Sequence, residues 1–141
     1  MEKLRIITVK EVECVAYTLA RENMAFREPI PEFSSRFPNI LESCIAVPFQ
    51  VFSGRHMYPS LYSKAAILFY LMIKNRPFRN GNKRIAMTTL LVFLYINKKW
   101  LEVDNQELYN FAMWVTESNA RLKAETAKAI EKFLKLHIKN I

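Results

Sequence analysis

Residues 65–96 read AAILFYLMIKNRPFRNGNKRIAMTTLLVFLYI, and the predicted architecture follows from this segment. It contains two strongly apolar runs, 65–73 and 90–96, separated by a polar and basic segment. Each run is far shorter than the roughly 20 residues that a helix needs to cross a bilayer. The two runs therefore predict a pair of buried core helices, and no membrane span is expected.

The segment between the runs cannot continue a helix. Pro77 fixes its own backbone and disfavours a helical conformation at Arg76, whereas Gly81 permits a tight turn. Ser60 has the residue type that caps helices, which predicts a first helix from there to about Asn75. The second helix is predicted from about Asn82 to Asn97.

Capping signals and apolar periodicity predict further helices on both sides of this pair. Thr8 with Glu11 has capping-box spacing and predicts a helix over about 9–22, followed by a Pro-rich loop over 23–38. A short helix over 39–46 and an ordered loop or small hairpin over 51–60 come next. Asp104 with Glu107 repeats the capping-box spacing. The last two predicted helices cover 105–118 and 121–137.

These elements together predict one all-α domain over residues 1–141. We expect a bundle of about five to seven helices, with at most one short strand pair or hairpin flap drawn from residues 4–7, 51–58 or 100–103. The length suits a single domain with its own core, and no repeat or linker suggests a second one.

The charge is concentrated in the middle of the chain. The formal net charge is +8, and residues 51–100 hold nine Lys or Arg and no Asp or Glu. A basic surface with an acidic partner is therefore expected. Chemistry centred in this region also lacks a local carboxylate to act as a base or to hold a metal.

Compartment and thiol chemistry follow from the N-terminal segment and the cysteines. The first residues show neither an apolar signal stretch nor a small-residue cleavage site, which predicts a cytoplasmic protein. Cys14 and Cys44 lie in helical segments without metal-binding or redox spacing. We expect both to be reduced, buried thiols.

The segment KNRPFRNGNKR, residues 74–84, has the features of an anion site. It carries five cations and no acid, and its last residues coincide with the start of a helix. A helix N-terminus contributes unpaired N–H groups and about half a positive charge. Phe78, an apolar residue between cations, is expected to anchor the loop in the core. A solvated basic turn is the alternative reading.

The run NRPFRNGNKRIA resembles the signature of the Fic/Doc family, which reads His-Pro-Phe, two residues, Gly-Asn, Gly or Lys, and Arg. Lys83, together with Met87 where other members have a further Arg, is closer to the Doc, or death-on-curing, branch. The similar order and spacing extend over roughly residues 8–120. The resemblance implies the fold of this family, an α-helical domain whose signature loop holds a nucleotide.

The resemblance implies a role for each loop residue. Gly81 gives the tight turn, Asn82 and Arg84 contact phosphates, and Lys83 adds positive charge. Two positions depart from the pattern. Arg76 stands where the family has its general-base His, and Asn80 stands where the family has an acidic metal ligand. A guanidinium does not accept a proton at physiological pH, and a neutral amide is a weak ligand for a hard cation.

The leading hypothesis is therefore a Doc-like toxin-family protein that keeps the phosphate loop over residues 76–84 and has lost transferase activity. Arg76 and Asn80 would then be inactive versions of the catalytic positions. ATP is a candidate ligand, while Mg²⁺ is doubtful and no metal site is predicted. The resemblance also implies a small antitoxin as a partner and a translation factor as a target.

Two other functions stay open at this point. One is an active toxin–antitoxin phosphotransferase or nucleotidyltransferase that modifies a protein hydroxyl with a rearranged base, for which His56 is the candidate. The other is a basic nucleic-acid-binding module that uses Phe52, Tyr58, Tyr62 and Phe78 for stacking. The absence of a recognisable reading motif disfavours nucleic acid as a partner.

Overall fold

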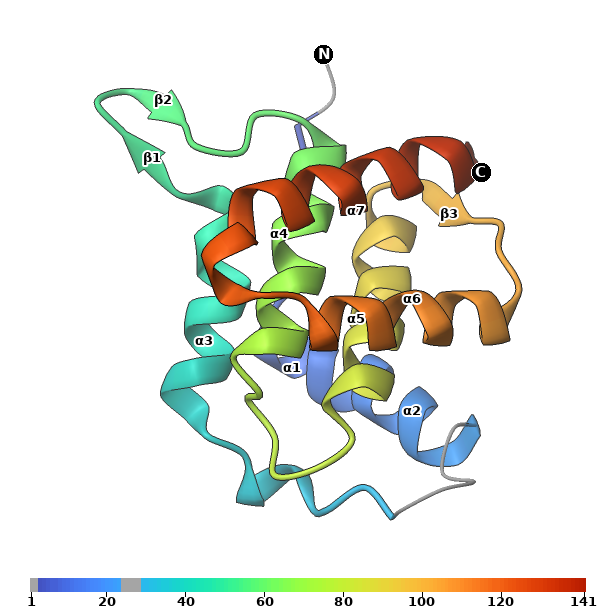
Figure 1. Cartoon of the computed structure of the whole chain (residues 1–141). Helices are drawn as coiled ribbons and strands as arrows, with labels where there is room; N and C mark the ends of the chain where they lie inside the picture. Colours follow the sequence, from blue (N-terminus) through green and yellow to red (C-terminus); the bar gives the residue numbers. More distant parts are fainter. Residues whose placement is uncertain (1–2, 24–28) are drawn as a thin grey trace.

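The computed structural model describes residues 3–23 and 29–141 and confirms the all-α prediction (Figure 1). An N-terminal helical stretch consists of α1, a π-helical turn and α2. Short 3-10 turns and five longer helices follow. The bounds of the helices are α1 Val9–Glu11, the π-helical turn Val12–Tyr17, α2 Thr18–Asn23, α3 Pro38–Ala46, α4 Leu61–Lys74, α5 Asn82–Ile96, α6 Asn105–Glu117 and α7 Lys123–His137.

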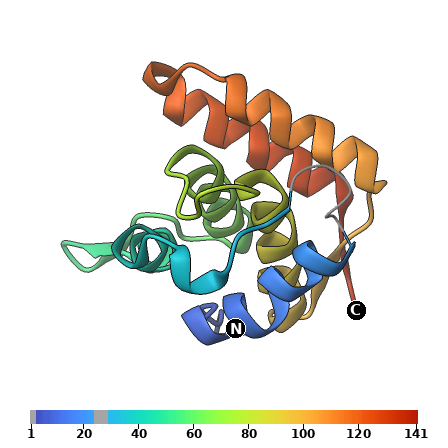
Figure 2. The ribbon, with the colours of Figure 1, turned by 90° about the horizontal axis from the view of Figure 1, so that it is seen from below.

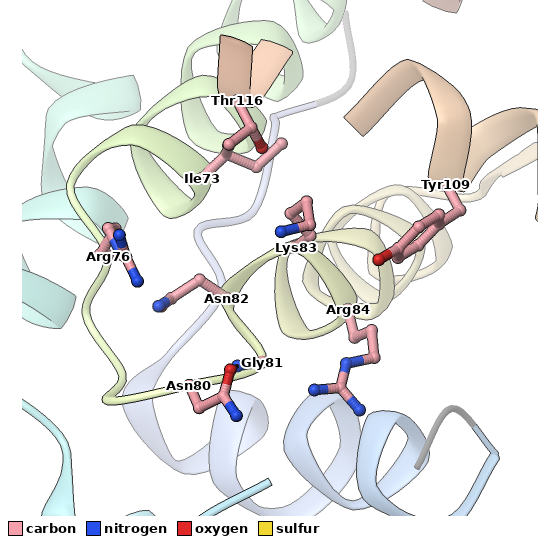
Figure 3. Close-up of a pocket in the computed structure, with 9 residues that line it drawn as sticks. All are labelled: Ile73, Arg76, Asn80, Gly81, Asn82, Lys83, Arg84, Tyr109 and Thr116. Atoms are coloured by element: carbon pink, nitrogen blue, oxygen red, sulfur yellow. Dashed lines mark hydrogen bonds between the residues drawn. The ribbon is translucent and has the colours of Figure 1, made fainter. Parts of the chain in front are cut away.

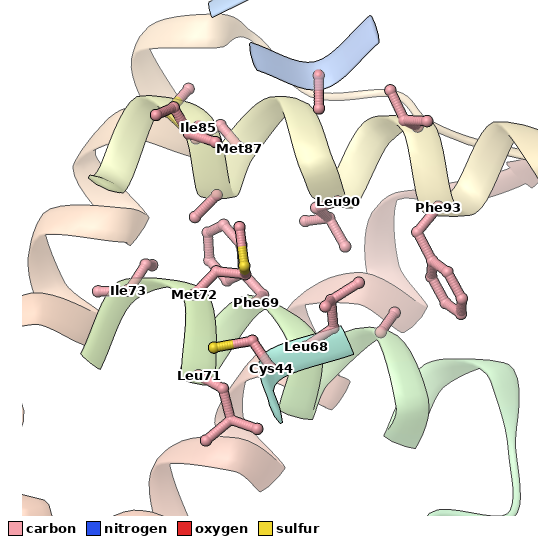
Figure 4. Packing of buried hydrophobic residues seen from close by; sticks show 14 of the residues in the cluster. Cys44, Leu68, Phe69, Leu71, Met72, Ile73, Ile85, Met87, Leu90 and Phe93 are labelled. Carbon is pink, nitrogen blue, oxygen red and sulfur yellow. The ribbon is translucent and has the colours of Figure 1, made fainter. Parts of the chain in front are cut away.

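Helices α4 and α5 form the centre of the domain. Figures 1 and 2 show α6 and α7 lying side by side across one side of this pair, with the N-terminal helical stretch on the opposite side and α3 flanking α4. The interior between these layers is filled by side chains of the two apolar runs and by neighbouring residues such as Cys44, Ile85 and Met87 (Figure 4). Fully buried members include Leu68, Phe69, Met72, Ile85, Met87, Leu90, Phe93 and Leu94. The two core helices are thus confirmed.

Two short antiparallel strand pairs accompany the helices. β1 Val51–Phe52 pairs with β2 Arg55–His56, which forms a hairpin within the predicted 51–60 segment. β3 Lys99–Leu101 pairs with β4 Ile138–Asn140, and β4 continues directly from α7. The expectation of at most one strand pair was therefore wrong. Residues 100–103 were a predicted candidate strand, but their partner was not predicted, because the paired strands are only three residues long and lie about 40 residues apart in the sequence.

Side-chain capping is confirmed at two of the three predicted helix starts and is wrong at the third. Thr8 and Glu11 form the reciprocal capping box, and Ser60 forms one with Ser63. Asp104 occupies the N-cap position of α6, but its side chain makes no capping hydrogen bond. The expected capping box there was wrong. Glu107, which would be its other member, lies 3.8 Å from Nε2 of His137 in α7.

The N-terminal helical stretch differs from a regular helix by its π-helical turn. Within this turn the Ala16 carbonyl accepts a hydrogen bond of 2.6 Å from Oγ1 of Thr88 in α5. Apolar periodicity predicts the helix over 9–22 but carries no signal for this turn, because the bond that satisfies the carbonyl comes from 72 residues away in sequence. A tertiary contact therefore accompanies the local irregularity.

The two cysteines lie in different environments. Cys44 is buried, and burial raises the pKa of its thiol to about 12. Cys14 is exposed, so the expectation that both thiols are buried was wrong for Cys14. It lies in the π-helical turn, where its side chain faces away from the core.

Within residues 3–23 and 29–141, no helix combines the length and the apolar character that a membrane crossing requires.

Candidate anion-binding site

A cavity of about 290 Å³ lies where the 75–81 loop meets the start of α5 and one face of α6 (Figure 3). Its walls come from the end of α4, from the loop, from the first turn of α5 and from α6. The residues that line it are Ile73, Arg76, Asn80, Gly81, Asn82, Lys83, Arg84, Tyr109 and Thr116. The cavity thus collects six of the seven residues predicted for the site, and Phe78 lies outside its lining.

Gly81 makes the tight turn into α5 possible. Its φ of +78° lies in the left-handed region, which side chains with a Cβ rarely adopt. A Cβ at this position would also stand 2.8 Å from Cγ1 of Ile30. The glycine is therefore required by both the backbone and the neighbouring segment.

Asn82 ties the loop to the helix that follows it. Its Oδ1 accepts a hydrogen bond of 2.9 Å from the Phe78 N–H, and its Nδ2 donates one of 2.8 Å to the Phe78 carbonyl. The side chain is buried, at 8% exposure. These bonds give Asn82 a structural role in the loop, while the phosphate contact that the resemblance implies stays a prediction.

Phe78 is buried in an aromatic cluster beneath the loop. Its ring stacks against Tyr17 with 6.3 Å between centroids and lies 5.8 Å from the ring of Phe33. The Tyr17 hydroxyl donates a short hydrogen bond to the Pro31 carbonyl. The loop is therefore held from below by the N-terminal helical stretch and by the segment that follows Pro29.

The five cations of the 74–84 segment fall into two groups, two that make structural hydrogen bonds and three that line the cavity. Lys74 donates through Nζ to the carbonyls of Thr116 and Ser118, at 3.2 and 2.6 Å, and fastens the end of α6 to α4. Arg79 donates through Nε to the Ser35 carbonyl at 3.1 Å. The other three, Arg76, Lys83 and Arg84, line the cavity.

Arg76 has an unusual backbone conformation. Its φ of +50° lies in the left-handed region although it is not glycine. This conformation costs a residue with a Cβ about 1–2 kcal/mol. The neighbouring Pro77 is held by a 2.8 Å hydrogen bond from the Phe37 N–H to its carbonyl. The packing of the loop therefore imposes a position on Arg76 that its own backbone preference opposes.

The side-chain oxygen of Asn80 contacts the backbone of the loop in which it lies. Oδ1 of Asn80 accepts a hydrogen bond of 2.8 Å from the Gly81 N–H. The described residues that line the cavity include no Asp, Glu or His. Across residues 3–23 and 29–141, no group of three or more His, Cys, Asp or Glu side chains could hold a metal ion.

Helix α6 contributes two lining residues that were not predicted from the sequence, Tyr109 and Thr116. They are seven positions apart, so they lie on one face of the helix. That spacing was visible in the sequence, but nothing in it indicated that this face meets the 75–81 loop. Ile73, at the end of α4, was expected only as a core residue.

His56 lies at the other end of α4 from the cavity. Its Nδ1 is 3.5 Å from Nζ of Lys64, in the first turn of α4, whereas Arg76 follows the last turn. A helix of 14 residues is about 20 Å long, so most of the length of α4 separates His56 from Arg76. Lys64 is buried beneath the hairpin and donates to the carbonyls of Pro48 and Tyr58, and burial lowers its pKa.

Comparisons with known proteins identify the family of the chain. The family model described as "Fic/DOC family" matches residues 12–94. The protein named "Toxin Doc" from Mycolicibacterium smegmatis (strain ATCC 700084 / mc(2)155) is 34% identical over 73 residues, which cover 52% of this chain and 56% of the relative. The chain therefore spans little more than half the length of that curated relative.

No solved structure matches the chain. The match to the family model nevertheless covers more than half of the chain, including α4, the signature loop and most of α5. On that match, the chain belongs to the Fic/Doc family.

Proposed function

We propose that this chain is a Doc-like toxin-family protein that binds a phosphate-bearing ligand, such as ATP, and has lost transferase activity. The observation that carries the proposal is the position of Arg76 on the wall of a cavity whose other charged lining residues are Lys83 and Arg84. Three cations next to the N-terminus of a 15-residue helix favour an anion. Gly81, Asn82, Lys83 and Arg84 would form the phosphate cradle.

The loss of transfer follows from the chemistry of Arg76. A phosphate transfer to a protein hydroxyl requires a group that accepts the hydroxyl proton as the bond forms. A guanidinium has five N–H donors, no acceptor, and a pKa above 12. Arg76 can therefore neutralise phosphate charge but cannot take the proton.

The alternative, an active transferase with a rearranged base, depends on His56. Its imidazole lies beside Lys64 at the hairpin end of α4, whereas Arg76 follows the opposite end of that helix. Reaching the cavity would require the hairpin to cross the length of α4. The contacts of His56 thus favour a protein without transfer over one with a relocated base.

A nucleic-acid-binding function has weaker support. Stacking on bases requires exposed aromatic rings close to the cations. Phe78 is 4% exposed, and Tyr58 and Tyr62 are half-buried. Phe52 is 72% exposed, but it lies on the hairpin near the start of α4 and not beside the 75–81 loop.

The similarity to a Doc toxin also supports a proposal about the partners of this chain. We propose a small antitoxin as the natural binding partner, a bacterial translation factor as the protein that an ancestral activity would have modified, and the cytoplasm as the location. The chain has a net charge of +8, so an antitoxin with an acidic binding segment would be complementary to it.

The experiment combines binding with transfer. The full chain is titrated with ATP by calorimetry and is then incubated with labelled ATP and purified bacterial translation factors. We expect binding without transfer, and we expect transfer to appear in the double variant Arg76→His with Asn80→Asp. Robust transfer by the unaltered chain that disappears in Lys83→Ala would refute the proposed loss of activity, and loss of transfer in His56→Ala would identify the relocated base.

A further inference from the structure

The Fic/Doc resemblance implies Mg²⁺ on the phosphates, held by an acidic side chain at the position of Asn80. The residues present do not fit that ion. Mg²⁺ is bound in proteins through one or two carboxylates together with substrate phosphates. The described lining of the cavity has no carboxylate, and Oδ1 of Asn80 already accepts the Gly81 N–H at 2.8 Å.

We propose that the cavity binds a diphosphate group directly, without Mg²⁺, and that Mg²⁺ weakens this binding. The inference rests on the proposed phosphate-binding function and specifies its ligand. Arg76 and Lys83, with Arg84 beside them, take the charge-neutralising role that a metal ion has in a Mg²⁺-dependent site. The ligand is a diphosphate, either free or as the tail of a nucleotide.

The placement of Arg76 is the first support for this inference. The loop holds Arg76 at a φ of +50°, which a residue with a Cβ adopts at a cost. The hydrogen bond from Phe37 to Pro77, the buried ring of Phe78 and the clamp of Asn82 all fix the loop around it. A loop backbone that is fixed before the ligand arrives loses less entropy when the ligand binds, and it keeps the base of the exposed Arg76 side chain at the cavity wall.

The separation of the loop cations is the second support. Arg79 and Lys74 are used for contacts to carbonyl groups outside the cavity, so the positive charge that faces the cavity comes from particular residues and not from a general basic surface. A phosphate monoester carries about −1.5 to −2 charge at neutral pH. A second phosphoryl group makes the ligand more negative, so that its charge comes closer to matching the positive charge of three cations and a helix N-terminus.

Charge also predicts the effect of Mg²⁺. When Mg²⁺ binds a diphosphate in solution it removes two negative charges from the ligand and occupies phosphate oxygens that the guanidinium would otherwise contact. With no carboxylate among the described lining residues to attract it, the bound Mg²⁺ ion is repelled by the lining cations, and the complex keeps less of the negative charge that those cations attract. Free diphosphate is therefore the tighter ligand.

The size of the cavity limits what else enters it. Its volume of about 290 Å³ lies at the lower end of the range of pockets for small molecules, roughly 300–1,000 Å³. A diphosphate fits within that volume, and the nucleoside of a nucleotide would lie outside. Pyrophosphate and ADP are therefore expected to bind with similar affinity.

The test is a calorimetric titration of the full chain with pyrophosphate and with ADP, each in EDTA and in excess Mg²⁺. We expect the dissociation constant to be about tenfold lower in EDTA, which corresponds to 1.4 kcal/mol. Binding that is tighter in Mg²⁺ would overturn the metal-free inference while leaving the phosphate-binding function intact. No binding of either ligand under either condition would overturn both.

Two arginines of the same loop provide a matched pair of variants. Arg76→Gln removes a cation from the cavity wall, whereas Arg79→Gln removes the same charge three residues away, where the side chain contacts Ser35. We expect Arg76→Gln to weaken pyrophosphate binding about tenfold and Arg79→Gln less than about twofold. Equal losses would show a diffuse effect of net charge and overturn the site, as would ADP binding much more tightly than pyrophosphate. Thermal melts confirm that both variants fold.

Discussion

Asn82 holds the backbone of Phe78 by both ends of its side-chain amide, through hydrogen bonds of 2.9 Å from the Phe78 N–H and 2.8 Å to the Phe78 carbonyl. The first residue of α5 thereby closes the loop that precedes it. The same pair joins the cavity to the core, because the Asn82 side chain lines the cavity while the Phe78 ring packs against Tyr17.

Replacing Asn82 should cost stability through this clamp. Asn82→Ala removes two buried hydrogen bonds and leaves the N–H and the carbonyl of Phe78 without their partner, so we expect the free energy of unfolding to fall by about 2–3 kcal/mol. Urea denaturation measures the loss. Asn110→Ala, on the exposed face of α6, is the control and should change the free energy by less than about 0.5 kcal/mol. Equal effects in the two variants would contradict the clamp.

The two glycines of the chain form a second matched pair. Gly54 and Gly81 have nearly the same φ, +76° and +78°, but a Cβ on Gly54 would meet nothing within 4 Å, while one on Gly81 would stand 2.8 Å from Ile30. We expect Gly54→Ala to cost about 1–2 kcal/mol for the backbone alone. Gly81→Ala should cost roughly 1–3 kcal/mol more because the new methyl group overpacks the site.

A double-mutant cycle isolates that steric contribution. In an Ile30→Ala background the extra cost of Gly81→Ala should largely disappear, because the atoms that the new methyl group meets have been removed. If the cost is unchanged in that background, the Ile30 contact is not its source.

Two neighbouring threonines of α5 should respond in opposite ways to the loss of a hydroxyl. Thr88 donates to the Ala16 carbonyl at 2.6 Å, whereas Oγ1 of Thr89 is buried and has no hydrogen-bond partner among the described residues. Thr88→Val should lower the free energy of unfolding by about 1–2 kcal/mol. Thr89→Val should leave it unchanged or raise it, since a buried polar group without a partner is removed. Both are measured by urea denaturation, and a reversed order would contradict the assignment.

The two cysteines should differ in their reactivity. Iodoacetamide at mildly alkaline pH should label Cys14, which is exposed, and leave Cys44 unmodified in the folded protein. Burial both excludes the reagent from Cys44 and raises the pKa of its thiol to about 12, and the thiolate is the reactive form. Mass spectrometry of the labelled peptides reads the result, with a sample in denaturant as the positive control. Fast labelling of Cys44 under native conditions would contradict its burial.

The raised pKa of Cys44 also makes stability depend on pH. Its ordinary value is 9.0 and its folded value is about 12. Below pH 9 the thiol is neutral in both states and its contribution to stability is complete. Above pH 9 the unfolded state loses the proton first, so the free energy of unfolding falls as the pH rises towards 12. Cys44→Ala should make this fall less steep, and an unchanged slope would contradict the shift.

Some parts of this molecule were predictable because they depend on neighbours in sequence. The capping box at Thr8, the helix cap at Ser60, the break at Pro77 and the left-handed turn at Gly81 all arise within a few residues. Asp104 has the same local spacing, yet Glu107 lies near His137 in α7 instead of capping α6. The same local spacing therefore forms a capping box at Thr8 and none at Asp104, so the local pattern alone does not decide the outcome.

The candidate site shows the same division. The cations of the 74–84 segment were evident in the sequence, but their separation into cavity-lining and structural groups depends on carbonyls of Ser35, Thr116 and Ser118, which lie about 40 residues away. The contribution of Tyr109 and Thr116 to the wall likewise follows from the packing of α6 beside the loop.

The amino-acid sequence was sufficient to predict an all-α domain with two buried central helices and a basic loop of Fic/Doc type between them. Periodicity, proline and glycine act locally, and the family signature is a property of consecutive residues. Three features became evident only in the folded chain: which cations line the cavity, the position of His56 at the opposite end of α4, and the hydrogen bonds between Asn82 and Phe78. Those outcomes depend on which distant groups the folded chain brings within hydrogen-bonding distance.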